Sequence, residues 1–162
     1  MRSQMAGGAL VELTMVLPIL LTLTLVTVEI AQALAAYKAL LTQVQSAARY
    51  LSTRPPGAGH VEATCLVTHG QASPTRPCTG SPLMPGFTAA GFSVSVLDAV
   101  NAPATHQSQR SSANPAVTQA VTVNLVTVTA SGYAHPLIFA TVLSSSATIG
   151  LGSVSFTFRQ AS

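Results

Sequence analysis

The feature that most constrains this chain is a long apolar stretch near its N-terminus. No charged residue occurs between Leu13 and Val28, and apolar residues dominate through Leu34. A lipid bilayer requires about 20 apolar residues at a rise of about 1.5 Å each, and the stretch from Ala9 to Ala36 is long enough. Because a segment in lipid must satisfy its own backbone hydrogen bonds, the sequence predicts a membrane-spanning helix.

The same helix is expected to continue out of the membrane. Beyond Val28 the apolar residues recur at alternating spacings of four and three, which is typical of a narrow helical packing stripe. Pro55 and Pro56 should stop it, because proline disfavours helical geometry in the residue before it. We therefore predict one helix from Gly7 to Ser52, with a packing seam buried against a β-domain or against partner helices. The seam consists of Ile30, Leu34, Tyr37, Leu41, Val44, Ala48 and Leu51.

The composition supports a membrane or assembly protein. Hydrophobic residues make up 48% of the 162-residue chain and charged residues only 7%, whereas a soluble domain has roughly 25% charged residues. The seven basic residues form no patch, so we expect no nucleic-acid partner. A secretory signal has an apolar core of only about 7–15 residues, so we interpret the apolar stretch as a retained anchor.

The two cysteines indicate the compartment. Cys65 and Cys78 are the only ones in the chain, and they lie in a stretch rich in Pro, Gly and Ser. An isolated pair in such a stretch favours a disulfide in an oxidising compartment. The basic residues on the two sides of the membrane helix nearly balance, so the positive-inside rule does not decide its orientation. The cysteines favour a cytoplasmic N-terminus and a C-terminal part outside the cytoplasm.

The rest of the chain predicts a small antiparallel β-domain. Residues 91–97 alternate in polarity as a half-buried strand does, and residues 121–129 form the strongest strand pattern, with a change of parity after Leu125 that indicates a bulge. Residues 147–158 predict the last strand, with a second parity change at Gly150 and Gly152. Residues 101–119 are polar and predict an exposed loop, and residues 133–143 predict a short apolar turn or helix.

The expected fold class is therefore α+β: a long N-terminal transmembrane helix that continues into a small antiparallel β-sheet domain outside the membrane. The predicted regions are a leader-like N-terminus (1–8), a transmembrane and extramembrane helix (9–52), a Pro/Gly-rich loop with the cysteine pair (53–90) and the β-domain (91–162).

Catalytic and metal-binding patterns are weak. Only two acids, Glu62 and Asp98, lie beyond the helix, too few for a convincing acid/base pair. His60, Glu62, Cys65 and His69 are close enough in sequence to be imagined as metal ligands, but we favour a solvated loop with one disulfide. The remaining histidines, His106 and His135, are isolated. We expect no enzyme, no cofactor and no metal site.

Glu12, near the start of the helix, has two interpretations. A carboxylate there is costly in lipid, and the positive helix N-terminus and interfacial water offset part of the cost. It either marks the bilayer boundary or takes part in assembly. If the chain were cut between Gly7 and Gly8, Glu12 would be the fifth residue. This is the arrangement of type IV pilins, in which such a glutamate is thought to pair with a neighbour's N-terminal amine.

The first 52 residues resemble the N-terminal signature of TadE-like proteins of the tight-adherence (Flp) pilus machinery. The shared features are small residues before Val11-Glu12, an aliphatic run containing Pro18, a second glutamate at Glu29, and Tyr37. The run from Ala47 to Leu51 (AARYL) closes the signature. Beyond this segment the resemblance is loose, being limited to a Val/Thr strand followed by Tyr133 and an apolar Pro-Leu turn.

The resemblance implies a pseudopilin-like structural component of a tight-adherence pilus assembly or a related secretion system. It implies a single-pass protein of the bacterial inner membrane with a periplasmic C-terminal domain. The expected partners are membrane lipid and other membrane or pilus-assembly proteins in a hetero-oligomer. The alternative is an uncleaved single-pass accessory subunit that stabilises another large bacterial envelope complex.

Overall fold

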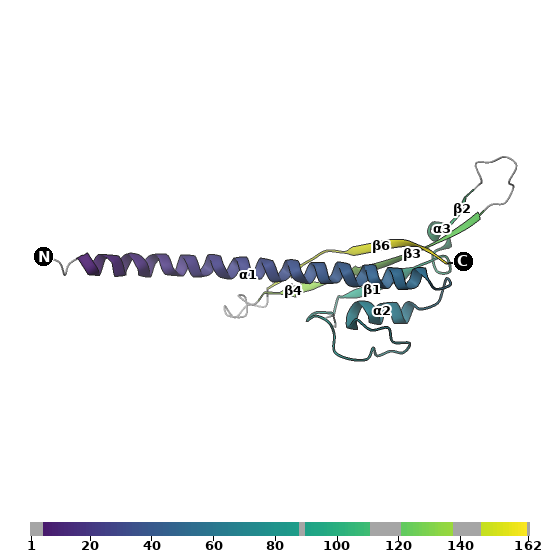
Figure 1. Ribbon diagram of the computed structural model, residues 1–162, viewed down its shortest axis with the longest axis horizontal. Helices are drawn as coiled ribbons and strands as arrows, with labels where there is room; N and C mark the ends of the chain where they lie inside the picture. Colours follow the sequence, from purple (N-terminus) through teal and green to yellow (C-terminus); the bar gives the residue numbers. More distant parts are fainter. Residues whose placement is uncertain (1–4, 88–89, 111–120, 138–146, 162) are drawn as a thin grey trace.

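The computed structural model describes residues 5–87, 90–110, 121–137 and 147–161. A single helix, α1 (Met5–Ser52, 48 residues), runs most of the length of the molecule (Figure 1). The α+β class and the predicted end of the helix before Pro55 are confirmed. The other elements are α2 (His60–His69), β1 (Ser93–Leu97), α3 (Pro103–His106), β2 (Gln107–Arg110), β3 (Val121–Ser131), β4 (Ala134–Pro136), β5 (Thr148–Gly150) and β6 (Val154–Gln160). Of these, α2, β3 and β6 pack against the C-terminal half of α1 (Figure 1).

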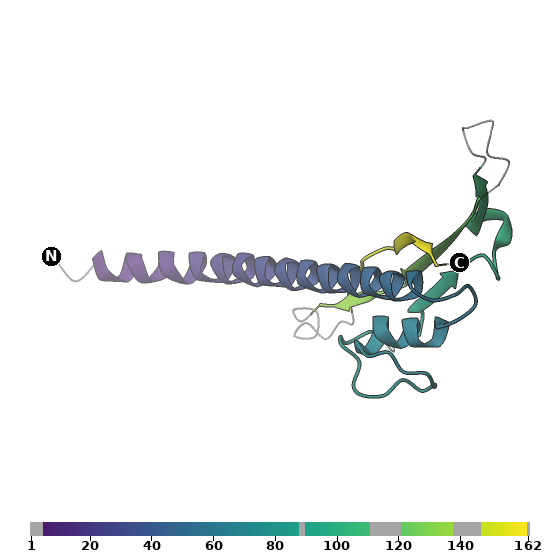
Figure 2. The same cartoon turned by 45° about the vertical axis from the view of Figure 1, so that its right-hand side comes forward.

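The main sheet is antiparallel and is built around β3. Strand β6 pairs with one side of β3, from Asn124↔Gln160 to Ala130↔Val154. On the other side β1 pairs with residues 127–131 and β2 pairs with residues 121–124. A separate two-stranded sheet, β4–β5, lies toward the N-terminal half of α1 (Figures 1 and 2).

The core lies between α1 and one face of the main sheet. Alternation along the strands directs one parity inward, because successive side chains point to opposite faces. From β3 these are Val126, Val128 and Ala130, all buried, and Val154 of β6 joins them. The rings of Phe87, Phe92 and Tyr133 pack together at one end of this core, with centroids 4.9–6.3 Å apart. The outer face of the sheet carries hydroxyl side chains, and Thr127 and Thr157 hydrogen-bond across it at 2.7 Å.

Two local features fix how the domain joins the helix. The residue that follows β6 caps α1, because the Ala161 N–H donates a hydrogen bond to the Ser52 carbonyl oxygen at 2.8 Å. Without this bond, that carbonyl oxygen at the helix end would lack a partner. The turn after β3 requires Gly132, which has a φ of +77°, and a Cβ there would collide with the backbone carbonyl of Gly91. This turn redirects the chain from the main sheet into β4.

Several sequence predictions need correction. The region 53–90 is not entirely loop, because α2 occupies residues 60–69. The region 101–119 is not an exposed loop throughout, because α3 and β2 occupy residues 103–110 and His106 is buried. The bulge after Leu125 is absent, since the β3–β6 register is continuous from residue 124 to residue 130. The change of parity lies near the end of α1, where Asn124 pairs with Gln160 and the Gln160 side chain donates a hydrogen bond to the Leu51 carbonyl oxygen.

Other strand predictions stand. The predicted strand at 91–97 is β1, and the strongest strand is β3. The stretch 147–158 contains β5 and β6 with a break around Gly152, where the parity change was predicted. The turn or helix predicted at 133–143 is wrong for residues 134–136, which form strand β4 because they pair with β5, and residues 138–143 lie outside the described residues.

Candidate functional site

The candidate site is the uncovered N-terminal half of α1. Nearly every large apolar side chain from Leu10 to Leu34 is more than 40% exposed, and the exposed side chains lie on all sides of the helix. By length and composition α1 can cross a membrane. One long apolar helix of this kind is compatible with a single-pass membrane protein.

The polar groups of this half are compatible with lipid. Each of its four threonines donates its hydroxyl to a carbonyl oxygen one turn back, at 2.7–2.9 Å. Such bonds leave no threonine hydroxyl without a partner, which matters where water is absent. The four are Thr14, Thr22, Thr24 and Thr27.

The two glutamates of the helix lie in different surroundings. The Glu12 side chain is exposed, and both Gly7 and Gly8 lie inside the first turns of α1. Glu29 is only 8% exposed and is the first buried side chain along the described part of the helix. Glu29 therefore marks the point where the domain begins to cover α1.

The packing seam is placed partly as predicted. Val44, Ala48 and Leu51 are fully buried, Tyr37 and Leu41 are half-buried, and Ile30 and Leu34 are 59% and 52% exposed. This chain's own domain does not cover Ile30 and Leu34, so burial of these two against a partner stays a prediction. The observed buried face consists of Ala33, Ala36, Leu40, Val44, Ala47, Ala48 and Leu51.

The shift of the seam has a geometric cause. A straight helix drifts about 20° per heptad relative to a seven-residue repeat, and the predicted seam spans three heptads. The predicted seam therefore coincides with the buried face at Leu51 and diverges from it towards Ile30. The alanines at positions 33, 36 and 47 belong to the buried face, and apolar size alone did not single them out.

Two apolar grooves flank α1 where it meets the β4–β5 sheet. One has a volume of about 430 Å³ and lies between Ile30, Leu34 and Tyr37 of the helix and Ile149 and Leu151 of the sheet side. The other, of about 340 Å³, lies on the His135 side and includes Gln32 and Tyr133. Neither groove has a charged residue in its lining.

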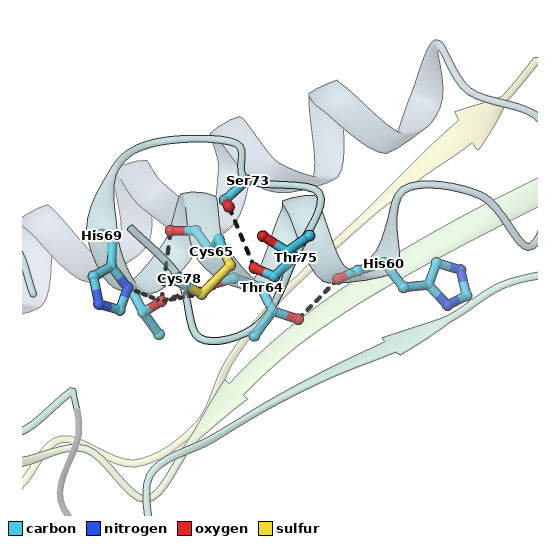
Figure 3. Close-up of a disulfide and its surroundings, with 8 residues drawn as sticks. His60, Thr64, Cys65, His69, Ser73, Thr75 and Cys78 are labelled. Carbon is cyan, nitrogen blue, oxygen red and sulfur yellow. Dashed lines mark hydrogen bonds between the residues drawn. A yellow bond between two sulfur atoms is a disulfide. The ribbon is translucent and has the colours of Figure 1, made fainter. Parts of the chain in front are cut away.

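Cys65 and Cys78 form the predicted disulfide, which ties α2 to the loop that follows it (Figure 3). Gly59 and Gly70 delimit α2 at its ends, both with positive φ. His60 and His69 lie at opposite ends of α2, on either side of the disulfide (Figure 3). Among the described residues no three His, Cys, Asp or Glu side chains gather as a metal site.

The most polar buried cluster surrounds Asp98, at the end of β1. Its carboxylate, which is fully buried, accepts hydrogen bonds from the Gly57 and Val100 N–H groups at 2.7 and 2.9 Å. It also lies 2.7 Å from Nε2 of His60. Burial by itself would raise the pKa of Asp98, but these hydrogen bonds together hold it below its ordinary value. The cluster joins the α1–α2 link to the sheet, so its role is structural.

A comparison with known protein families finds a match within helix α1. Residues 7–49 match the family model described as TadE-like protein. The N-terminal segment is TadE-like. No curated protein and no solved structure matches the chain. The TadE-like segment contains both the exposed half of α1 and most of the half that packs on the sheet.

Proposed function

We propose that the protein is a non-catalytic, pseudopilin-like component of a tight-adherence pilus assembly or a related secretion system. It acts by packing its helix in the membrane and by contacts of its β-domain outside the membrane. The observation that carries the proposal is the uncovered apolar half of α1, which lies within the TadE-like segment. The partners are membrane lipid and other membrane or pilus-assembly proteins.

The proposed location is the bacterial inner membrane, with the N-terminus in the cytoplasm and the C-terminal domain in the periplasm. The disulfide supports this orientation, because Cys65 and Cys78 lie on the C-terminal side of the apolar half and disulfides persist in oxidising compartments.

Glu12 is the proposed assembly residue. Its side chain is exposed on a helix whose neighbouring large side chains are apolar, and a carboxylate at the edge of lipid is stabilised by a positive partner. If the chain is cut between Gly7 and Gly8, the new ammonium group of a neighbouring subunit supplies that partner.

The second candidate is an uncleaved single-pass accessory subunit of another envelope complex. The start of α1 at Met5 favours it, because the Gly7–Gly8 peptide bond then lies inside a helix. A protease that takes an extended substrate would first have to unwind that turn. In this version Glu12 faces headgroups or water.

The two candidates are separated by the intact mass of the native protein together with the Glu12→Ala variant. Pseudopilin-like assembly predicts a chain that begins at Gly8, and Glu12→Ala should insert in the membrane but fail to form the extracted complex and surface pili. Thr14→Ala is the matched control, because the Thr14 hydroxyl bonds only to its own helix, and it should assemble normally.

A chain that keeps residues 1–7 and assembles normally as Glu12→Ala would exclude the processed mechanism. That result would leave the uncleaved accessory subunit. Failure of both variants to enter the membrane fraction would instead contradict the anchor itself.

A further inference from the structure

The exposed apolar surface of α1 continues onto the small β4–β5 sheet. Outside α1, four large apolar side chains in the described part of the chain are more than a third exposed: Leu83 (46%), Leu97 (41%), Val100 (64%) and Ile149 (38%). Of these, Ile149 lines the 430 Å³ groove together with Ile30 and Leu34 of α1, both of which are more than half exposed. The apolar band therefore passes from the helix to the sheet without a break.

The length of the helix places this groove at one boundary of a bilayer. Taking a hydrocarbon thickness of about 30 Å and a rise of about 1.5 Å per residue, a core that begins at Leu10 ends near Glu29. A core that begins after Glu12, at Leu13, ends near Gln32. Either choice brings the far boundary to the level of the β4–β5 sheet, which among the described elements of the domain lies nearest the uncovered half of α1 (Figures 1 and 2).

The charges around the groove agree with that boundary. Lys38 is the first basic residue of the helix in its described part, and it is exposed one turn beyond Leu34. Tyr37, an aromatic residue of the kind enriched at membrane interfaces, lines the groove itself. His135, which pairs with Ile149 across the sheet, lines the second groove. The exposed surface is thus apolar on the side of the bilayer, and its first charged residue, Lys38, lies one turn beyond Leu34.

We propose that the β4–β5 sheet rests on the bilayer, with Ile149 at the boundary between headgroups and acyl chains and with lipid in the groove beside Ile30 and Leu34. The domain is then held at a fixed height and tilt by two contacts, the helix and the sheet. This inference rests on the proposed membrane anchor and adds a second lipid contact to it.

The experiment uses the full chain in lipid nanodiscs, with an environment-sensitive fluorophore attached to one introduced cysteine at a time. The positions are Ile149, its neighbour Thr148, Val100 as a water-exposed control, and Leu23 as a control inside the membrane helix. Val100 is 64% exposed and lies beside Gly57, in the link that follows the C-terminal end of α1. Quenching is measured with lipids that carry a nitroxide near the headgroup and with iodide in the water.

The proposal predicts that labels at 149 and 148 are quenched by the shallow nitroxide at least twice as strongly as the label at 100, and that the label at 100 responds to iodide. A lipid-quenched label at 23 with labels at 149 and 148 that behave like 100 would overturn the sheet contact and leave the anchor intact. Labels at 149 and 148 shielded from both quenchers would indicate a protein occupant and would also overturn it. A label at 23 that iodide quenches would contradict the anchor on which the proposal rests.

Discussion

The two halves of α1 are similar in length and are both rich in apolar residues, yet they meet different surroundings. Between Leu10 and Val28 the large apolar side chains are exposed on every side of the helix, and none is covered by the domain. Between Ala36 and Leu51 the buried side chains lie along one stripe, and Lys38, Thr42 and Arg49 occupy other positions. Apolar content alone therefore does not tell where a helix packs.

The difference lies in the distribution of polar residues around the helix. A helix that is apolar all round needs an apolar medium on all sides, whereas one with a single apolar stripe needs one partner surface. The N-terminal half meets the first condition and the C-terminal half the second. The change falls between Glu29 and Ala36, where the first side chains become buried.

The largest effect that separates the halves is expected from Leu40→Ala. Leu40 is fully buried in the core between helix and sheet, and such truncations cost about 2–5 kcal/mol. Leu41→Ala should cost less, because Leu41 is only half-buried, and Leu20→Ala in the exposed half should leave the domain unchanged. The measurement is urea unfolding of the domain in detergent micelles, followed by circular dichroism.

Equal destabilisation by Leu40→Ala and Leu20→Ala would break the comparison, since it would mean that the N-terminal half also supports the domain. A larger loss of domain stability for Leu41→Ala than for Leu40→Ala would support the packing seam predicted from the sequence and contradict the observed buried face.

A smaller effect is expected from acid, and only on the domain. Hydrogen bonds hold the pKa of Asp98 below its ordinary value of 3.8, so the unfolded chain binds a proton more readily than the folded one. The stabilisation by Asp98 is therefore present above about pH 4–5 and is lost as the pH falls through the lowered folded pKa. The urea concentration at the midpoint of domain unfolding should therefore decrease as the pH is lowered from about 5 through the folded pKa of Asp98.

Asp98→Asn should be less stable than the wild type at neutral pH by roughly 1–3 kcal/mol and should lose most of this pH dependence. Retention of the helix in micelles should not change with pH over the same range. An acid transition that persists in full in Asp98→Asn would assign it to another group.

Much of this architecture follows from the sequence, because its strongest signals are local. The apolar run and the Pro55-Pro56 pair predict the bounds of α1 closely, and alternation predicts β1 and β3. The disulfide follows from the presence of only two cysteines. These signals depend on the residues of each segment alone.

The missed features depend on tertiary context. Helix α2 is short and lies between segments rich in Pro and Gly, so its sequence did not show a clear helical periodicity. Gly59 and Gly70, which flank it, are residues of the kind found at helix ends. His106, at the end of α3, is buried where α3 meets β3, and its Nε2 lies 2.9 Å from the hydroxyl of Thr127 on that strand. The buried face of α1 is set by where the sheet approaches, which a repeat in the sequence does not record.

The most direct test of the account is a nitroxide scan along α1 in a bilayer, comparing access to oxygen, which concentrates in lipid, with access to a water-soluble nickel chelate. From Leu13 to Val28 every label should be open to oxygen and closed to nickel, whichever side of the helix carries it. Beyond Ala36 access to both should fall periodically, with minima at Leu40, Val44 and Leu51. Nickel access within the first segment, or a buried stripe there like that of the second, would contradict the division of α1 into a lipid-facing half and a domain-facing half.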